Sequence, residues 1–202
     1  MSLNPEQLGL VNRAKNAVSP FDIGACLTEA FAGLKRDFWN IVLVHTVAMF
    51  LGCFIVTLPP LIIGIVRFNA KILAGEKASF DDLFGGFAEF GTSWLMFIVM
   101  IALLGVGFVL CYLPGIYLSV AWMFAWNLLA DKRGNFWECL EMSRQAVTAH
   151  WGWAFLLTIV AQIIANAGLI ACFIGVLATI PLYGLMLSAA YRRLFAEQAP
   201  QL

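Results

Sequence analysis

The side chains that most often carry chemistry are scarce in this chain of 202 residues. Its two histidines, His45 and His150, lie far apart in the sequence, and its five cysteines form no C-x-x-C pair. The sequence also contains no glycine-rich phosphate loop, no H-E-x-x-H and no G-x-S-x-G motif. We therefore predict no catalytic residue, no metal site and no cofactor, and we expect the protein not to be an enzyme.

His45 is a candidate functional residue because a polar side chain inside an apolar segment is energetically costly. It could bind haem or relay protons, or it could hydrogen-bond to a neighbouring helix. A bis-histidine haem needs a second ligand at similar depth, whereas His150 stands beside Trp151, where we expect the membrane surface. We favour the hydrogen bond to a neighbouring helix.

Further polar residues lie within or next to apolar segments, where they could line a polar path or contact lipid. They are Arg67, Asn69, Lys71, Asn127, Gln162 and Asn166. Gln162 and Asn166 are four residues apart and so share one face of a helix. With Asn127 they could line a path for a substrate or an ion, but we favour hydrogen bonds between packed helices. We expect Arg67 and Lys71 at the cytoplasmic end of a membrane pass, with their basic groups reaching the interface.

Composition predicts that these residues belong to an integral membrane protein. The chain is 62% hydrophobic and 12% charged, with a mean hydropathy of +0.87, whereas soluble domains are about half apolar and about a quarter charged. A core of this size cannot hide that excess, so lipid must solvate part of it. Lys plus Arg and Asp plus Glu number 12 each, and this balance gives no reason to expect nucleic acid as a partner. The expected partners are membrane lipids, and other membrane protein subunits are further candidates.

Three long segments without an acidic side chain, lysine or arginine indicate the membrane passes: 38–66, 90–130 and 145–191. A helix needs about 20 apolar residues to cross the hydrocarbon, so the second and third segments can each hold two passes. The first segment holds two if its second helix continues past Arg67 and Lys71. The predicted fold is an all-α integral membrane protein with six transmembrane helices in three hairpins: about 38–55 and 57–75, 91–111 and 113–130, and 150–169 and 172–191.

The basic residues predict the orientation of these hairpins. All 12 Lys and Arg residues fall in or next to the N-terminal segment, the two long connections and the C-terminus, and the three opposite turns carry no charge. By the positive-inside rule, both termini and the long connections are cytoplasmic.

The predicted cytoplasmic segments share a short pattern, which indicates a threefold internal repeat. "SPFD" at 19–22, "SFDD" at 79–82 and "NFWE" at 135–138 each place a capping residue three positions before an acid. This is the spacing of a capping box, and apolar residues then recur at helical intervals. We expect a cytoplasmic amphipathic helix at the membrane interface before each hairpin. The expected domains are a polar N-terminal segment 1–18, one membrane domain 19–196 with repeats 19–78, 79–134 and 135–196, and a tail 197–202.

A resemblance to a known group follows from one early run of residues and from three later stretches, "LPGIYLSVAWMFAWNLLAD", "SRQAVTAHW" and "TIPLYGLML…YRRLF". The run consists of Pro60-Leu61, Gly64, Gly75-Glu76, Leu83-Phe84 and Gly86-Phe87. It resembles a pattern in the uncharacterised YciC-like bacterial membrane proteins, which are similar to the membrane domain attached to some glycerophosphodiester phosphodiesterases. The resemblance extends over residues 20–196 and implies a helical protein of the bacterial cytoplasmic (inner) membrane. It implies no activity, because the cytoplasmic segments are too short to form the phosphodiesterase domain.

Two classes of function fit these observations. The first, which we favour, is a non-enzymatic scaffold, assembly factor or accessory subunit of a membrane complex, because catalytic motifs are lacking and the lipid-facing surface is large. The alternative is a lipid-handling protein or a small-solute transporter or channel with a polar path between the hairpins. An intramembrane enzyme is disfavoured because the sequence offers no nucleophile–base pair.

Overall fold

The computed structural model describes residues 3–17, 21–170 and 172–196, and within these ranges every regular element is a helix. The predicted all-α fold class is therefore confirmed. Apolar runs of helical length, separated by short polar or glycine-containing connections, account for this architecture.

The N-terminal segment folds as helix α1 (Pro5–Lys15), which the sequence analysis did not assign. Asn4 and Gln7 form a capping box, in which each side chain accepts a hydrogen bond from the other residue's backbone N–H. Val11 and Ala14 are fully buried. The segment is thus polar on one side only, and its apolar side packs on the rest of the chain.

The repeated capping pattern is present in two of the predicted places. Before α9 (Phe136–Thr148), Asn135 and Glu138 form the complete capping box predicted from the sequence. In the second copy, the carboxylate of Asp82 accepts the backbone N–H of Ser79, which is one half of such a box. The cap residue and the acid three positions later are thus hydrogen-bonded to each other in both places.

The first copy of the pattern differs from the prediction. Helix α2 (Ile23–Arg36) begins after Asp22, whose carboxylate accepts the backbone N–H of Ala25 and acts as the N-cap itself. The predicted cap, Ser19, lies outside the described residues.

The first predicted hairpin, 38–55 and 57–75, corresponds to α3 (Phe38–Gly52) and α4 (Leu58–Ala74). Helix α4 ends at Gly75, whose φ of +80° is the left-handed conformation that glycine adopts without strain at a helix C-terminus.

The second predicted hairpin is only partly correct. Helix α6 (Phe90–Cys111) matches the predicted helix 91–111. The predicted helix 113–130 is instead divided into α7 (Leu113–Ala121) and α8 (Ala125–Ala130).

A serine of α9 accounts for the break between α7 and α8. The hydroxyl of Ser143 donates to the carbonyl oxygen of Ala121 at 2.8 Å and accepts the backbone N–H of Phe124 at 3.3 Å. A side chain inserted into the hydrogen-bond ladder interrupts a helix at that point. Ser143 is fully buried, so these bonds replace helical ones that the broken segment lacks.

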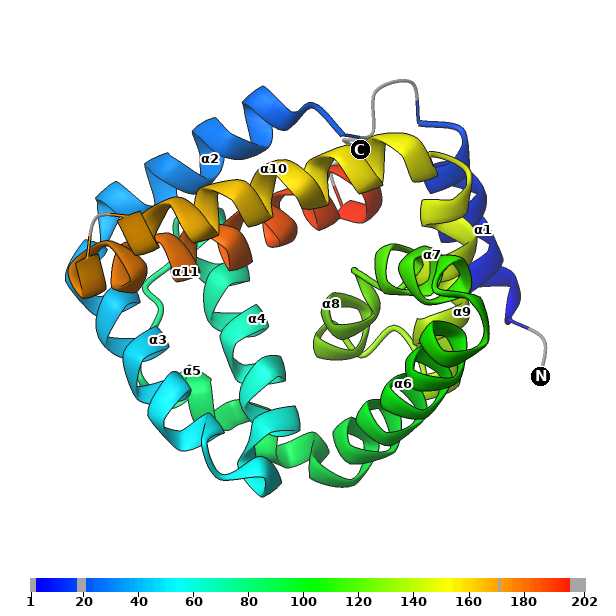
Figure 1. The fold of residues 1–202 in the computed structure, drawn as a ribbon, viewed down its shortest axis with the longest axis horizontal. Coiled ribbons are helices and arrows are strands. Elements are labelled where there is room, and N and C mark those ends of the chain that lie inside the picture. The colour runs from blue at the N-terminus through cyan, green and yellow to red at the C-terminus, as the bar shows by residue number, and fades with distance from the viewer. Residues whose placement is uncertain (1–2, 18–20, 171, 197–202) are drawn as a thin grey trace.

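The third predicted hairpin, 150–169 and 172–191, corresponds to α10 (Trp151–Ile170) and α11 (Cys172–Tyr191). Pro181 lies inside α11. Helices α10 and α11 run side by side in Figure 1.

Two short elements follow α4 and pack directly on it: α5 (Asp81–Phe84) and the 3₁₀ helix η2 (Gly85–Glu89). A Cβ built on Gly64 would overlap the backbone of α5, and one built on Gly86 would overlap the backbone of α4. Glycine is required at both positions because the two backbones touch.

The outer helices form a ring in Figure 1. Along one side lie α2, α10 and α11, whereas α3 and α6 form other parts of the outline. Helices α4 and α8 lie inside. The apolar core thus gathers around α4, α8, α9 and α11.

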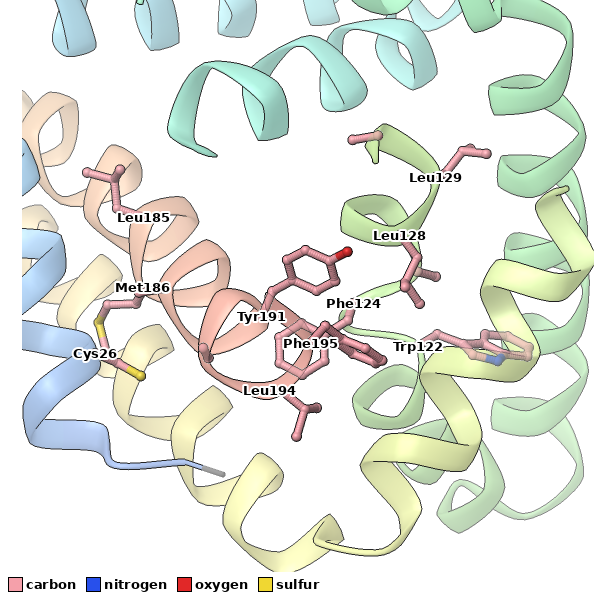
Figure 2. Close-up of a cluster of buried hydrophobic side chains, with 14 of the residues drawn as sticks. Cys26, Trp122, Phe124, Leu128, Leu129, Leu185, Met186, Tyr191, Leu194 and Phe195 are labelled. Carbon is pink, nitrogen blue, oxygen red and sulfur yellow. The ribbon is translucent and has the colours of Figure 1, made fainter. Parts of the chain in front are cut away.

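An aromatic cluster joins the end of the chain to the α7–α8 break. Phe124, Tyr191 and Phe195 lie together in Figure 2. The ring centroid of Phe124 is 6.0 Å from that of Tyr191 and 6.3 Å from that of Phe195, and the latter two are 5.2 Å apart. Phe195 belongs to η3 (Arg192–Ala196), a π-helical turn that follows α11. All three side chains are buried.

Three helical stretches are long and apolar enough to cross a membrane: Ile55–Ala74, Asp81–Leu110 and Leu113–Ala130. A fourth span results if α9 and α10, which meet at a bend of 102°, are taken together. Helix α3 is apolar but shorter, and this count covers only the part of the chain that the structure describes. Apolar helices of this length indicate a membrane protein. The six spans, the hairpin repeat and the interfacial position of the preceding helices stay predictions.

A candidate binding cavity between the helices

A cavity of about 400 Å³ lies between α4, α11 and the α7–α8 segment, and α3, α6 and α10 each contribute one residue to its wall. The helices around it can be followed in Figure 1. Most of the wall is aliphatic or aromatic, and the described lining residues include no Asp, Glu, Lys or Arg. The polar side chains of this wall are His45, Asn69, Ser119, Asn127, Thr158, Tyr183 and Ser188. Small-molecule sites commonly combine such a volume with a few polar groups in apolar walls.

Asn69 is the most informative of these side chains. It is 1% exposed, and neither its Oδ1 nor its Nδ2 has a hydrogen-bond partner. Leaving a buried polar group unsatisfied costs about 1–3 kcal/mol, and here both groups belong to one amide. A side chain of this kind in apolar surroundings indicates a bound molecule that supplies the missing bonds.

His45 also presents an unsatisfied nitrogen. Its Nδ1 lies 2.9 Å from the carbonyl oxygen of Ile41, one turn back in α3, while its Nε2 has no partner. The expected bond to a neighbouring helix is therefore wrong: the ring bonds to its own helix, and its ring contact with Phe68 of α4 is an edge contact without a hydrogen bond. Residues four apart along a helix are close neighbours, and this local bond competes with one between helices.

Gly184 of α11 brings the two unsatisfied side chains to the same part of the wall. A Cβ built on Gly184 would lie 2.8 Å from Nδ2 of Asn69 and 3.9 Å from Nε2 of His45. Gly184 therefore packs closely against Asn69, and a side chain at this position would collide with the amide.

Asn127 lines the cavity from α8 and is satisfied in part. Its Nδ2 donates to the hydroxyl of Ser188 on α11 at 3.4 Å. This bond between two helices matches the role that we favoured for Asn127 from the sequence.

Gln162 and Asn166 are not part of the cavity wall. Both are exposed on α10, and Nδ2 of Asn166 donates to the carbonyl oxygen of Gln162 within the same helix at 2.8 Å. The predicted path with Asn127 is therefore not formed by these residues, and Asn166 makes its bond within a helix and not between helices. The cavity residue of α10 is Thr158, one turn earlier than Gln162.

Arg67 lies outside the cavity, where it joins three parts of the chain. Its guanidinium donates to Glu89 of η2 at 2.7 Å, to the carbonyl oxygen of Gly85 at 2.8 Å and to that of Ala130 at 3.2 Å. Lys132 contacts the same carboxylate at 3.1 Å. We name Arg67, Glu89 and Lys132 the charge clamp, because they tie α4, η2 and the end of α8 together.

Lys71 makes a second ion pair from α4 to the segment that follows it. Its Nζ lies 2.6 Å from the carboxylate of Asp82, and its side chain is 41% exposed. Arg67 and Lys71 thus serve as structural contacts of α4 and do not enter the apolar cavity.

The polar wall residues that sequence analysis did not single out are Ser119, Thr158, Tyr183 and Ser188, and it also did not single out Gly184. Serine and threonine commonly bond to their own helix backbone, as Thr158 does to the carbonyl oxygen of Ala154, and so give little sign of a site in a sequence. Pro181 followed by Gly184 was the available sign, because small residues after a proline permit close approach in α11.

Among the described residues, no group of three or more His, Cys, Asp or Glu side chains could hold a metal ion. His150, the second histidine, has its Nε2 3.0 Å from the carbonyl oxygen of Lys15 and is not a cavity residue. The site therefore offers hydrogen bonds and apolar contacts.

No protein-family model, curated protein or solved structure matches this chain. Its class thus rests on the fold and the site: an all-helical protein with apolar helices of membrane-spanning length and an uncharged cavity between them. The resemblance to the YciC-like group stays a prediction.

Proposed function

We propose that this chain is a membrane protein that binds a lipid-like molecule in the cavity between its helices. The observation that carries the proposal is Asn69, a buried amide whose two polar atoms lack protein partners. Polar side chains that only hold helices together bond to one another, as Asn127 and Ser188 do. We therefore prefer lipid handling, the alternative in the sequence analysis, to a purely structural role.

The dimensions of the cavity favour an organic ligand. A water molecule takes up about 30 Å³ in the liquid, whereas the cavity measures about 400 Å³. Trp122, Trp126 and Ile62 offer a large apolar surface, and Asn69 and His45 offer hydrogen bonds. A molecule with an apolar body and a small polar group complements both parts of this wall.

Native mass spectrometry of the purified full chain tests the proposal. The protein is extracted in mild detergent as wild type, as Asn69→Leu and as Asn166→Leu. The Asn166→Leu variant is the matched control because it makes the same change on the exposed face of α10. We expect a stoichiometric lipid-like species with wild type and control, and its loss from Asn69→Leu. A wild-type chain without such a species, or equal contents in all three proteins, would contradict the proposal.

A role as accessory subunit or scaffold is the second candidate, and α6 favours it. In the apolar part of Asp81–Leu110, which includes α6, only 17% of the residues are buried within the chain. The corresponding shares are 44% in Ile55–Ala74 and 56% in Leu113–Ala130. A Cβ on Gly105 would have no neighbour within 4 Å, so another helix could approach closely there. Co-purification in mild detergent tests this role, because Gly105→Leu should release a bound partner. A chain that always emerges alone and monodisperse contradicts it.

A further inference from the structure

We infer that the polar group of the bound molecule is uncharged and carries an O–H or N–H donor. The inference rests on the proposed binding function and names the chemical class of the ligand. Three features of the cavity support it: the absence of charge from its described wall, the hydrogen-bonding state of His45 and the unsatisfied amide of Asn69.

The wall offers no counter-ion to a charged ligand. Its described residues include no Lys or Arg that could pair with a phosphate or carboxylate, and no Asp or Glu that could pair with an amine. Arg67 follows the wall residue Val66 in α4, but Glu89 and two carbonyl groups already occupy its guanidinium. Burying an unpaired charge is far more costly than burying a neutral polar group. Anionic lipids and fatty acids therefore fit this site poorly.

His45 requires a donor on the ligand. A backbone carbonyl can only accept, so the contact with Ile41 assigns the ring proton to Nδ1. Nε2 of the uncharged ring is then an acceptor without a partner. An ester or ether oxygen cannot satisfy it, whereas a hydroxyl or amide N–H can.

Asn69 requires both functions, since its Oδ1 accepts and its Nδ2 donates. A hydroxyl is a donor and an acceptor at once, and an amide group also supplies both. The polar group of the ligand belongs at the part of the cavity wall that Asn69 and His45 form. Fatty alcohols, acylglycerols with a free hydroxyl and fatty amides are lipids of this class.

Three probes with the same oleyl or oleoyl chain separate the alternatives. Oleyl alcohol is neutral and donates, methyl oleate is neutral and only accepts, and oleate is anionic. Binding of tritiated oleyl alcohol to the immobilised full chain is measured in detergent, with each unlabelled probe as competitor. We expect oleyl alcohol to compete at concentrations at least about tenfold lower than the other two, because a site built for hydrogen bonds discriminates against analogues that cannot make them.

Variants locate this discrimination. His45→Phe removes the acceptor and should bring oleyl alcohol and methyl oleate to similar affinities, whereas Asn166→Leu should preserve the wild-type ratio. Gly184→Ala places a methyl group against Asn69 and should weaken oleyl alcohol binding without changing either polar residue. Thermal melting of each variant establishes whether it is folded. If His45→Phe does not fold, the binding measurement on Gly184→Ala tests the proposal instead.

The outcomes distinguish the ligand class from the binding function. If oleate competes as well as oleyl alcohol, the inference that the polar group is uncharged is wrong. If methyl oleate competes as well as oleyl alcohol, the inference that this group carries a donor is wrong. Either result leaves the cavity as a binding site. Absence of saturable oleyl alcohol binding also overturns the class, and the proposed function then depends on the mass spectrometry of the co-purified species.

Discussion

At the scale of single residues, this chain buries an amide and an imidazole beside each other without bonding them together. Asn69 and His45 both lie next to Gly184, yet neither meets the other's hydrogen-bonding needs. Folding alone would favour an apolar residue at position 69, because the protein supplies no hydrogen-bond partner for either polar atom of the amide. Residues that lower stability in this way are typical of binding sites.

Replacing Asn69 by leucine should therefore stabilise the ligand-free protein. The change removes two unsatisfied buried groups, and we expect the free energy of unfolding to rise by about 1 kcal/mol or more. Thermal unfolding of delipidated protein in detergent measures the effect, and Asn166→Leu should leave the midpoint nearly unchanged. A lower midpoint for Asn69→Leu would mean that Asn69 is an ordinary packing residue bonded to its neighbours.

At the scale of elements, the break between α7 and α8 depends on one hydroxyl from α9. Ser143→Ala leaves the carbonyl of Ala121 and the N–H of Phe124 without this partner, so we expect a loss of about 1–3 kcal/mol. Ser93→Ala is the control, because Ser93 is equally buried but bonds only to Phe90 in its own turn. Equal midpoints for the two variants in thermal unfolding would show that Ser143 does not hold the break.

The contact of α4 with α5 and η2 is the second element with a sharp consequence. Gly64→Ala and Gly86→Ala each force a Cβ into a facing backbone, which cannot move aside as a side chain can. We expect either variant to lower the yield of folded, monodisperse protein severely. Gly105→Ala, in open space on α6, should instead be neutral or stabilise by up to about 1 kcal/mol. Wild-type yields for both close-packed variants would contradict this direct backbone contact.

At the scale of the whole molecule, the charge clamp connects the first helical pair to the end of α8. Glu89→Ala would leave Arg67 and Lys132 without their shared carboxylate, which is 16% exposed, and we expect a loss of about 1–3 kcal/mol. Glu141→Ala is the comparison, because its pair with Arg144 lies within one helix and such pairs contribute about 0–1 kcal/mol. Denaturation in detergent should give a lower free energy of unfolding for Glu89→Ala than for Glu141→Ala. The reverse order would count against a stabilising role of the charge clamp.

Much of the fold was predictable because its causes are local. Charge-free runs indicate α3, the first part of α4, α6, α10 and α11, and the spacing of Asn135 and Glu138 marks the start of α9. The break after Ala121 was not predictable, since its cause, Ser143, lies in a later helix. For the same reason the four-residue spacing of Gln162 and Asn166 showed that they share a face, but not that this face is exposed.

The sequence identified several residues of the site, but it did not predict where in the fold they come together. His45, Asn69 and Asn127 were identified because polar side chains are rare in apolar segments, and all three line the cavity. Which of them bond to protein depends on packing between α3, α4, α8 and α11. The sequence predicted that Arg67 and Lys71 both reach the membrane interface. In the structure each forms an ion pair with an acid of the segment that follows α4.

The proposed binding function, which rests on the unpartnered amide of Asn69, also implies that the lifetime of the protein depends on the supply of its ligand. A ligand at a hundred times its Kd adds about 2.7 kcal/mol to the free energy of unfolding. Cellular proteases remove chains in step with the unfolded fraction, so an empty protein is cleared sooner than an occupied one. We expect the turnover of wild type, measured by pulse-chase, to slow when the ligand is abundant. The turnover of Asn69→Leu should not change with the amount of ligand. If both respond alike, occupancy of this cavity does not govern abundance in the membrane.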